Sequence, residues 1–175
     1  GRIKHNAVND SVVADPSVVT LGNNVTITVR MNNVTSGKVL IEVNKHNYTV
    51  DLNNSVAVLK LNLTEGNYPV KAYFLGDDKY NATNKSGNTF KVVAKNTTVI
   101  NITVKDIVVV DDNVTFTVVT NSTAPLTIKV NGQAVTHVSG NTYKFTNASV
   151  VGTYTITATT PENDYYYAGS NSTTF

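Results

Sequence analysis

One strand and the loop after it occur twice in this chain of 175 residues. The first copy runs from Gly66 to Ala82 (Gly-Asn-Tyr-Pro-Val-Lys-Ala-Tyr-Phe-Leu-Gly-Asp-Asp-Lys-Tyr-Asn-Ala), and every second residue of its strand is apolar. Such alternation places one face of an extended strand in a core. A degenerate copy begins at Gly152 (Gly-Thr-Tyr-Thr-Ile-Thr-Ala) and ends with the loop 164–168, Asp-Tyr-Tyr-Tyr-Ala. Two copies of one strand and loop predict two copies of one domain.

Other short strands with the same alternation surround this motif in both halves of the chain. Residues 24–31 place Val25, Ile27 and Val29 on one face, and residues 113–118 repeat the pattern. The remaining strands that we expect are 11–21, 38–43, 48–52, 56–61 and 89–93, with 126–131 and 142–146 as second copies of 39–44 and 56–61. No segment has a helical period. About seven short strands per repeat, separated by Asn, Gly and Asp turns, are typical of an antiparallel sandwich of immunoglobulin (Ig) type.

These patterns predict an all-β chain that forms two tandem Ig-like antiparallel β-sandwiches. We expect the first domain at 1–94, with 1–10 as a lead-in, and the second domain at 95–175. The joining segment 92–98 contains no Gly or Pro, whereas flexible linkers are longer and rich in Gly and Ser. We therefore expect a stiff, extended tandem. Because Phe175 falls inside a predicted strand, we also expect the sequence to be a piece of a longer protein.

Two residue types mark special positions in the predicted sandwiches. Pro16 interrupts the strand 11–21 and predicts a sheet edge, because proline has no N–H to donate to a ladder. Tyr68 and Tyr154 each follow a Gly-x pair at the start of the penultimate strand. A tyrosine there can donate its hydroxyl proton to the backbone of the preceding turn, which would otherwise hold an unpaired polar group. We expect both residues to form such a tyrosine corner.

Three short motifs resemble a known family. They are Gly-Asp-Asp-x-Tyr-Asn-Ala at 76–82, Gly-Asn-Asn-Val-Thr at 22–26 and Asp-Asp-Asn-Val-Thr at 111–115. Together they resemble the bacterial-type Ig-like repeats that occur in tandem in large adhesin-like surface proteins, as in methanogenic archaea. The resemblance covers nearly the whole chain, twice, and it implies an extracellular, cell-surface location. The second copy departs from the pattern at 161–164, where Pro-Glu-Asn-Asp replaces the Gly-Asp-Asp turn.

Composition excludes several classes of function. The net charge of +2 and the charged fraction of 15%, with Lys and Arg spread singly, do not predict nucleic-acid binding. No apolar run approaches the roughly 18 residues that span a bilayer, so we expect no membrane span. The chain has no cysteine, which removes disulfides, thiolate-bound zinc and thiol catalysis. That absence favours a prokaryotic surface protein or an intracellular one.

Catalytic residues do not form a recognisable pattern. His5, His46 and His137 fall in a lead-in, a turn and a strand end, and none recurs in the other half. A glycosidase pair would need two carboxyl groups held across a cleft, and small sandwiches rarely offer one. We therefore expect no enzyme activity and no cofactor.

Adjacent acids occur in two predicted turns, at Asp77-Asp78 and Asp111-Asp112. Calcium takes oxygen ligands from such loops, and a calcium site at Asp77 and Asp78 stays open as an alternative. Asp77 has no acid counterpart, because Asn163 takes its place in the second copy. Asp and Asn also cap their own backbone in turns. We interpret these acids as turn residues, not as a metal site, and the pair at 77–78 as variable between the copies.

Triplets of the form Asn-x-Ser/Thr, the acceptor sites for N-glycosylation, are abundant. Alternating strands rich in Asn and Thr generate some of them by chance, but the excess favours a glycosylated outer surface. The candidates are Asn24, Asn33, Asn62, Asn81, Asn101 and Asn113, and further triplets begin at Asn9, Asn47, Asn53, Asn84, Asn96, Asn121, Asn147 and Asn171.

The tyrosines at 165–167 are the sharpest local anomaly. When the two copies are aligned, Tyr166 corresponds to Tyr80. Tyr165 and Tyr167 then take the places of Lys79 and Asn81, so these two tyrosines have no aromatic counterpart in the first copy. The loop before the last strand of an Ig sandwich lies at the pole where the first strand enters. The two side chains can therefore contact the first domain, lie exposed in solvent, or bind a glycan or protein partner. By the same argument, the corresponding loop of the first copy faces whatever domain precedes it.

The favoured function is a non-catalytic, cell-surface stalk or adhesin segment whose partners are neighbouring Ig-like repeats of the same chain. Two alternatives remain. One is a glycan- or protein-binding module with its site in the Tyr165/Tyr167 loop. The other is an accessory domain of a secreted enzyme.

Overall fold

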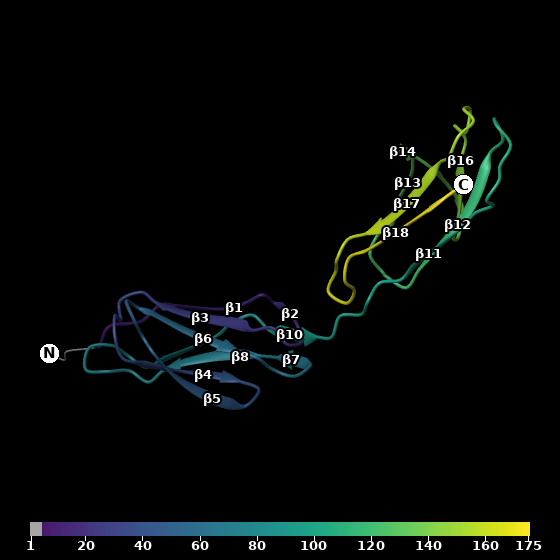
Figure 1. Cartoon of the computed structure of the whole chain (residues 1–175). Helices are drawn as coiled ribbons and strands as arrows, with labels where there is room; N and C mark the ends of the chain where they lie inside the picture. The colour runs from purple at the N-terminus through teal and green to yellow at the C-terminus, as the bar shows by residue number, and fades with distance from the viewer. Residues whose placement is uncertain (1–4) are drawn as a thin grey trace. The chain divides into compact units, whose positions relative to one another are not determined.

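The structure, a computed structural model, describes residues 5–175 (Figure 1). All regular elements in this range are β-strands, which confirms the predicted fold class. No helix in the same range is long and apolar enough to cross a membrane. The chain divides into two compact units, Gly1–Ala94 and Lys95–Phe175. The sequence analysis places the domain boundary at the same point.

The first unit is a series of short strands joined by tight turns. Its strands are β1 (Asp10–Asp15), β2 (Val18–Thr20), β3 (Val25–Met31), β4 (Lys38–Val43), β5 (His46–Asp51), β6 (Val56–Leu61), β7 (Gly66–Tyr68), β8 (Val70–Phe74), β9 (Thr83–Ser86) and β10 (Phe90–Val93). The strand β9 has no counterpart among the predicted strands. Its sequence, Thr-Asn-Lys-Ser, carries no apolar alternation, and only its pairing with β8 makes it a strand.

One layer of the first sandwich continues past an interruption. β7 and β8 are separated by Pro69, which has no N–H to donate, and β9 and β10 are separated at 87–89. The Gly87 amide still donates to the Val70 carbonyl, and β10 pairs with β7 beyond the interruption. The sheets β5-β4-β8-β9 and β2-β10-β7 are thus two parts of one layer, and β1-β3-β6 forms the other.

The break predicted at Pro16 carries the chain from one layer to the other. β1 pairs antiparallel with β3, whereas β2 pairs in parallel with β10. The peptide bond between Asp15 and Pro16 is cis. Both β1 and β2 are edge strands of their sheets, as expected for a strand that contains a proline.

Inward residues of the alternating strands form the core of the first unit. Val25, Ile27 and Val29 of β3 are at most 1% exposed, and the predicted inward residues of β4, β7 and β8 are buried as well. β5 differs because it is an edge strand paired with β4. Its Tyr48 and Val50 are half-buried and pack against the margin of the core.

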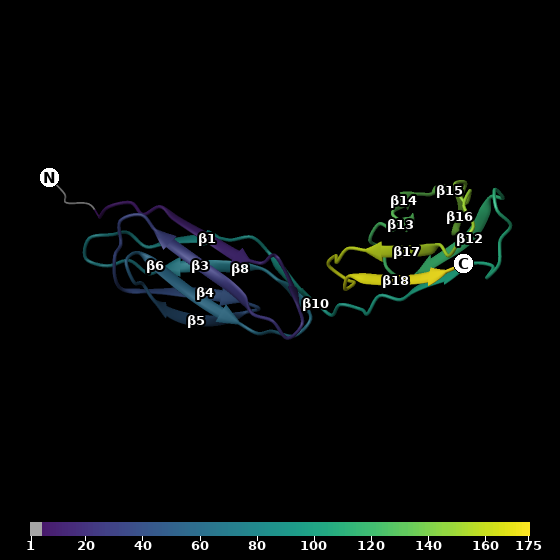
Figure 2. The ribbon, with the colours of Figure 1, turned by 45° about the horizontal axis from the view of Figure 1, so that its top comes forward.

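The second unit repeats this plan with two four-stranded sheets, β11-β12-β16-β15 and β14-β13-β17-β18. Its strands are β11 (Ile100–Thr103), β12 (Val114–Thr120), β13 (Thr127–Val130), β14 (Gln133–Ala134), β15 (Thr136–Ser139), β16 (Thr142–Phe145), β17 (Thr155–Thr160) and β18 (Gly169–Thr174). Figure 2 shows β17 and β18 side by side, in agreement with their antiparallel ladder. β12 pairs with β16 as β3 pairs with β6. This confirms the predicted equivalence of 142–146 and 56–61.

The units differ in the segment that follows β4 in the first unit and β13 in the second. In the second unit β14 pairs briefly with β13, and after Ala134 the chain crosses to the edge of the other sheet as β15, which pairs with β16. In the first unit, β5 stays with β4 along its whole length. The side chains of β15 are all exposed, and among its near neighbours Val135 packs against the core. With so little apolar surface, this segment has no strong preference for one layer.

Residues 5–10 are more than the lead-in that the sequence analysis predicts. Asn6 exchanges two backbone hydrogen bonds with residues 79–81, at 2.8 and 2.9 Å, and forms a parallel bridge there. Val8 packs against the core. A single bridge leaves no periodic pattern in a sequence, which is why the contact was missed. Residues 1–4 of the predicted lead-in lie outside the described residues.

In each unit a tyrosine hydroxyl is bound to the backbone of the preceding turn. Tyr68 donates to the Thr64 carbonyl at 2.7 Å, and Tyr154 donates to the Val150 carbonyl at 2.6 Å. Each ring also stacks on a phenylalanine, Phe90 of β10 in the first unit and Phe175, directly after β18, in the second, with ring centroids 5.1 and 5.3 Å apart. This arrangement has the geometry of a tyrosine corner.

Replacing Tyr68 by Phe should lower the free energy of unfolding of the first unit by about 1–2 kcal/mol, because the Thr64 carbonyl loses its partner while the ring stays in place. Denaturant unfolding, followed by amide NMR signals that report each unit separately, measures the change. Tyr154→Phe is the matched control. It should act on the second unit alone, and more weakly, because Tyr154 is less buried. An unchanged first unit in Tyr68→Phe would contradict the structural role.

Candidate functional site

The loop between β17 and β18 is built around Asn163. The Asn163 side-chain oxygen accepts hydrogen bonds from the Tyr165 and Tyr166 amides, at 3.0 and 2.9 Å. The backbone amide of Asn163 donates to the Tyr166 carbonyl at 3.0 Å. Asn favours such turns because its short side chain can mimic a backbone acceptor. The tyrosines at 165–167 are therefore held by a defined turn.

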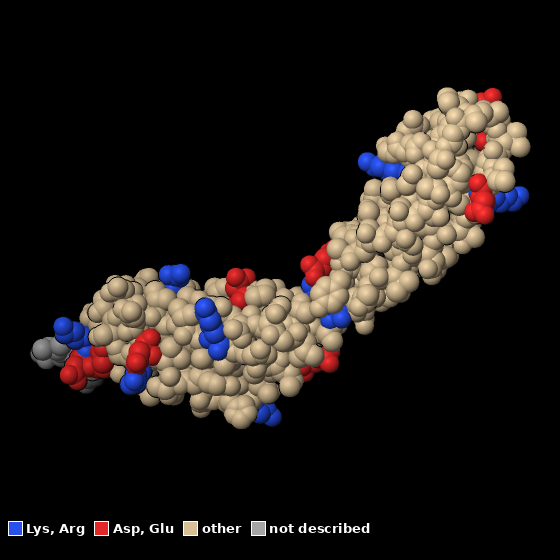
Figure 3. Space-filling view, in the orientation of Figure 1, with Lys and Arg blue, Asp and Glu red and all other residues tan. Residues whose placement is uncertain are grey.

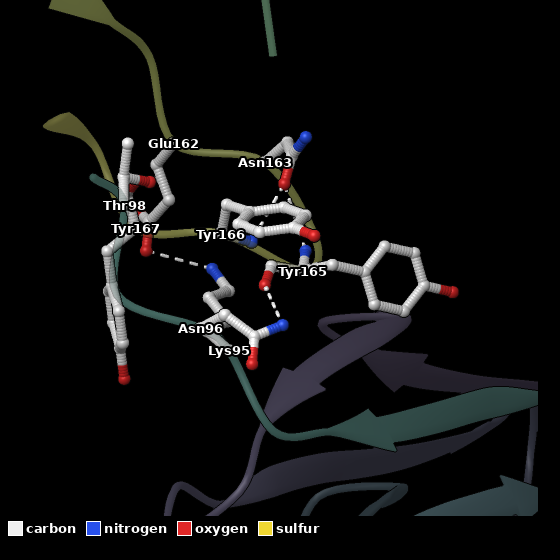
Figure 4. A network of polar contacts seen from close by, with 8 residues as sticks. All are labelled: Lys95, Asn96, Thr98, Glu162, Asn163, Tyr165, Tyr166 and Tyr167. Atoms are coloured by element: carbon white, nitrogen blue, oxygen red, sulfur yellow. Dashed lines mark hydrogen bonds and ion pairs between the residues drawn. The ribbon is translucent and has the colours of Figure 1, made fainter. Parts of the chain in front are cut away.

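Residues 95–98, the first residues of the second unit, bind this loop and are called the strap below (Figure 4). The Asn96 amide donates to the Tyr165 carbonyl at 2.8 Å, and the Tyr167 amide donates to the Asn96 carbonyl at 3.0 Å. The Thr98 hydroxyl donates to the Tyr167 carbonyl. The Lys95 ammonium pairs with the Glu162 carboxylate at 2.9 Å, and its side chain is only 14% exposed. These contacts place the loop at the pole where the first strand enters, as the sequence analysis expects.

Tyr165 and Tyr167 share this loop but not one face of it. Each side chain is 45% exposed, and in Figure 4 the two rings point away from each other on either side of the strap. The ring of Tyr166 lies between them over the polar network. Two rings that diverge do not offer one flat platform for stacking on a sugar. Each ring is accessible by itself.

The matching loop of the first unit corrects our interpretation of Asp77. The Asp77 carboxylate accepts hydrogen bonds from the Lys79 and Tyr80 amides, both at 2.8 Å, and its amide donates to the Tyr80 carbonyl at 3.0 Å. Asn163 makes the same set of contacts in the second unit. These contacts confirm the turn role predicted for Asp77. The interpretation of Asp77 as variable between the copies is wrong, because Asn163 performs the same role in the second copy.

Residues 5–175 contain no group of three or more His, Asp or Glu side chains placed to hold a metal ion. Burial raises the pKa of the Asp10 carboxyl above its usual value, against the opposing effect of the Lys85 ammonium. A raised carboxyl pKa can mark an acid catalyst. Here the Lys85 ammonium donates to the Asp10 carbonyl at 2.9 Å, so the pair ties β9 to β1.

Charged and polar side chains are dispersed. On the face drawn in Figure 3, Lys, Arg, Asp and Glu occur singly or in small groups between uncharged residues. The His137 ring nitrogen Nε2 lies 2.7 Å from the Gly140 carbonyl oxygen, and the centroids of the His137 and Tyr143 rings are 4.9 Å apart. These contacts are a local structural role.

The asparagines of all the predicted glycosylation triplets are exposed.

The sequence analysis missed an apolar groove in the second unit. It has a volume of about 290 Å³ and is lined by residues 106–110, 150–154, Ala148 and Phe175. Ile107 and Val151 are 87% and 85% exposed beside it. Two apolar runs in the sequence could have signalled this surface, Ile-Val-Val-Val at 107–110 and Val-Val at 150–151. The corresponding segments of the first unit contain polar residues, since 18–21 is Val-Val-Thr-Leu and 64–65 is Thr-Glu.

Residues 12–93 match the family described as "Bacterial Ig-like domain (group 3)". The first unit matches a bacterial Ig-like domain. The matched range begins within β1 and extends to the end of β10, which supports the resemblance drawn from the motifs for this unit. A search of curated proteins finds no match.

Two solved structures resemble the chain over nearly its whole length. The fibronectin(III)-like modules of CbhA from Clostridium thermocellum align with a TM-score of 0.59 at 16% identity, over 93% of this chain and 92% of theirs. A 1.5-MDa bacterial ice-binding adhesin aligns with a TM-score of 0.51 at 17% identity, over 98% of this chain. The chain spans 65% of that adhesin structure. At such identities the likeness shows the fold alone.

Two substitutions at Asp77 separate a turn role from a metal role. Asp77→Asn keeps the accepting oxygen and should change the free energy of unfolding of the first unit by less than about 0.5 kcal/mol. Asp77→Ala removes the acceptor for two amides and should cost about 1–2 kcal/mol. Denaturant unfolding with and without added calcium measures both. Calcium-dependent stability that Asp77→Asn abolishes would contradict the turn role.

Proposed function

We propose that this chain is a non-catalytic segment of an extracellular surface protein, in which Ig-like units in series form a stalk or adhesin module. The proposal rests on what the two units share. Both contain the tyrosine corner, the turn built on Asp77 or Asn163, and the bridge of Asn6 or Asn96 to that turn. All of these contacts hold the scaffold together. The shared parts therefore support a mechanical role.

The junction between the units supports a stalk. β10 ends at Val93, and the Ala94 amide donates to the Glu65 carboxylate of its own unit at 3.2 Å. The next residue, Lys95, already pairs with Glu162 of the second unit. Ala94 and Lys95 are thus each held by contacts within their own unit. A flexible connection would need a longer segment rich in Gly and Ser.

Surface location draws on the relatives and on the exposed asparagines. The family matched by the first unit is bacterial and Ig-like, and the adhesin that shares the fold is described in terms of host cell surface retention. We propose that exposed triplets such as Asn24, Asn33 and Asn113 carry glycans in the native protein. The intact mass of protein from its natural source should exceed the sequence mass. An equal mass would refute this part.

A second candidate function is binding through the loop 161–168. The exposed rings of Tyr165 and Tyr167 favour it, since each offers an apolar face and a polar tip. Because the rings diverge, such a partner would contact them separately or wrap around the strap. A protein surface fits this demand better than a single sugar ring.

A stalk should show no preference on a panel of glycans and cell surfaces, and substituting both Tyr165 and Tyr167 by Asn should leave the binding profile unchanged. The matched control substitutes both by Phe, which keeps the rings. Selective binding that is lost with Asn and kept with Phe would contradict the stalk and establish a binding module. Circular dichroism of both variants confirms that the turn is intact.

A further inference from the structure

The outer face of the sheet β1-β3-β6 is an exposed surface of the first unit. Alternate residues of the three strands pack in the core, so the residues between them face outward. The ladders place Val13 opposite Thr28 and Thr28 opposite Val58, which forms one row across the sheet. Val13 and Val58 are 50% and 48% exposed. The middle of this face is therefore a largely apolar row that is open to solvent.

A charged row flanks the apolar row on each side. On one side Arg30 lies opposite Ser11. On the other side Thr26 lies between Asp15 of β1 and Lys60 of β6. The side chains of Arg30, Asp15 and Lys60 are exposed. Within the described part of the chain, neither Arg30 nor Asp15 has an ion-pair partner. Both charges are therefore available to a partner.

This pattern is complementary to itself. A second copy can face it across a two-fold axis that runs across the strands, in line with the apolar row. The axis keeps each strand over the same strand of the second copy and reverses its direction, so Val13 and Val58 meet their own counterparts. The row of Arg30 then faces the row of Asp15 of the second copy, and the reverse contact forms at the same time. Each contact joins a guanidinium to a carboxylate, a pairing that gives strong, charge-assisted hydrogen bonds.

We propose that the outer face of β1-β3-β6 is a docking surface for a second copy of this chain. The two apolar rows pack against each other, as the facing rows of two aligned sheets do. The two reciprocal pairs of Arg30 with Asp15 set the register of the contact. Lys60 lies in the row of Asp15, and its charge opposes the facing Arg30. Because β6 is an edge strand, the long side chain of Lys60 can extend past the sheet and keep its ammonium in water.

The second unit does not carry this pattern on the corresponding face. β12 pairs with β16 as β3 pairs with β6, which places Val119 where the first unit has Arg30. Asn101 lies opposite Val119, in the place of Ser11. Asn101 begins a glycosylation triplet, whereas no triplet begins within β1, β3 or β6. The docking surface therefore belongs to the first unit alone.

The contact should be weak. A standard interface buries about 800 Å² on each partner, and one face of three short strands offers less than that. We expect a dissociation constant of about 0.1–1 mM. Association should weaken further as salt is added, because salt screens charge pairs at a surface.

A concentration series of the full chain, made without glycans, tests the proposal by NMR. Between about 0.05 and 2 mM the amide signals of β1, β3 and β6 should shift, whereas those of Asn101 and Val119 serve as the internal reference and should not. Arg30→Glu and Asp15→Arg should each abolish the shifts, because each change places like charges across both contacts. Circular dichroism checks that both variants fold.

An equimolar mixture of the two variants is the matched control. In a mixed pair each changed side chain faces the opposite charge of the other variant, so the shifts should return. Shifts that are absent from the parent chain at every concentration would overturn the proposal. So would shifts that persist in either single variant, or a mixture that behaves like the single variants. Shifts centred on 107–110 would overturn it as well, since they would assign the association to the groove of the second unit.

Discussion

Each sandwich depends on how its last strand is paired. In the first unit β10 lies between β2 and β7, and its Phe90 stacks on the ring of Tyr68. One short strand therefore fixes the edge strand β2, covers the core beneath Val92 and supports the tyrosine corner. In the second unit the same stacking is present between Tyr154 and Phe175.

The loop contacts that repeat in both units are made by backbone and by a few polar side chains at the surface. Asn6 and Asn96 bridge the equivalent loop in each unit, and Asp77 and Asn163 hold it by the same turn. Such contacts give partners to backbone groups of the loop. What varies between the units is the outer surface, including the extra tyrosines. A protein built from repeated scaffolds with changing surfaces is suited to mechanical and presentational work, and that is the function proposed for this chain.

Strands with buried alternation could be predicted from the sequence, and strands without it could not. β4 has the predicted bounds, 38–43, because its apolar residues face the core at every second position. β9 and β15 were missed because their side chains lie mostly in solvent and leave no period. The turn role of Asp77 was predicted, but its equivalence to Asn163 was missed because the two residues share the turn and not the charge. The groove was missed because the apolar runs at 107–110 and 150–151, which could have signalled it, were not compared with the matching segments of the first copy.

Hydrogen exchange of the unaltered chain tests most directly whether the two units are copies of one scaffold. The Asn6 and Asn96 backbone amides should be protected to a similar degree, because each donates to the loop before the last strand of its unit. Rapid exchange at one of them beside a protected amide at the other would contradict this account.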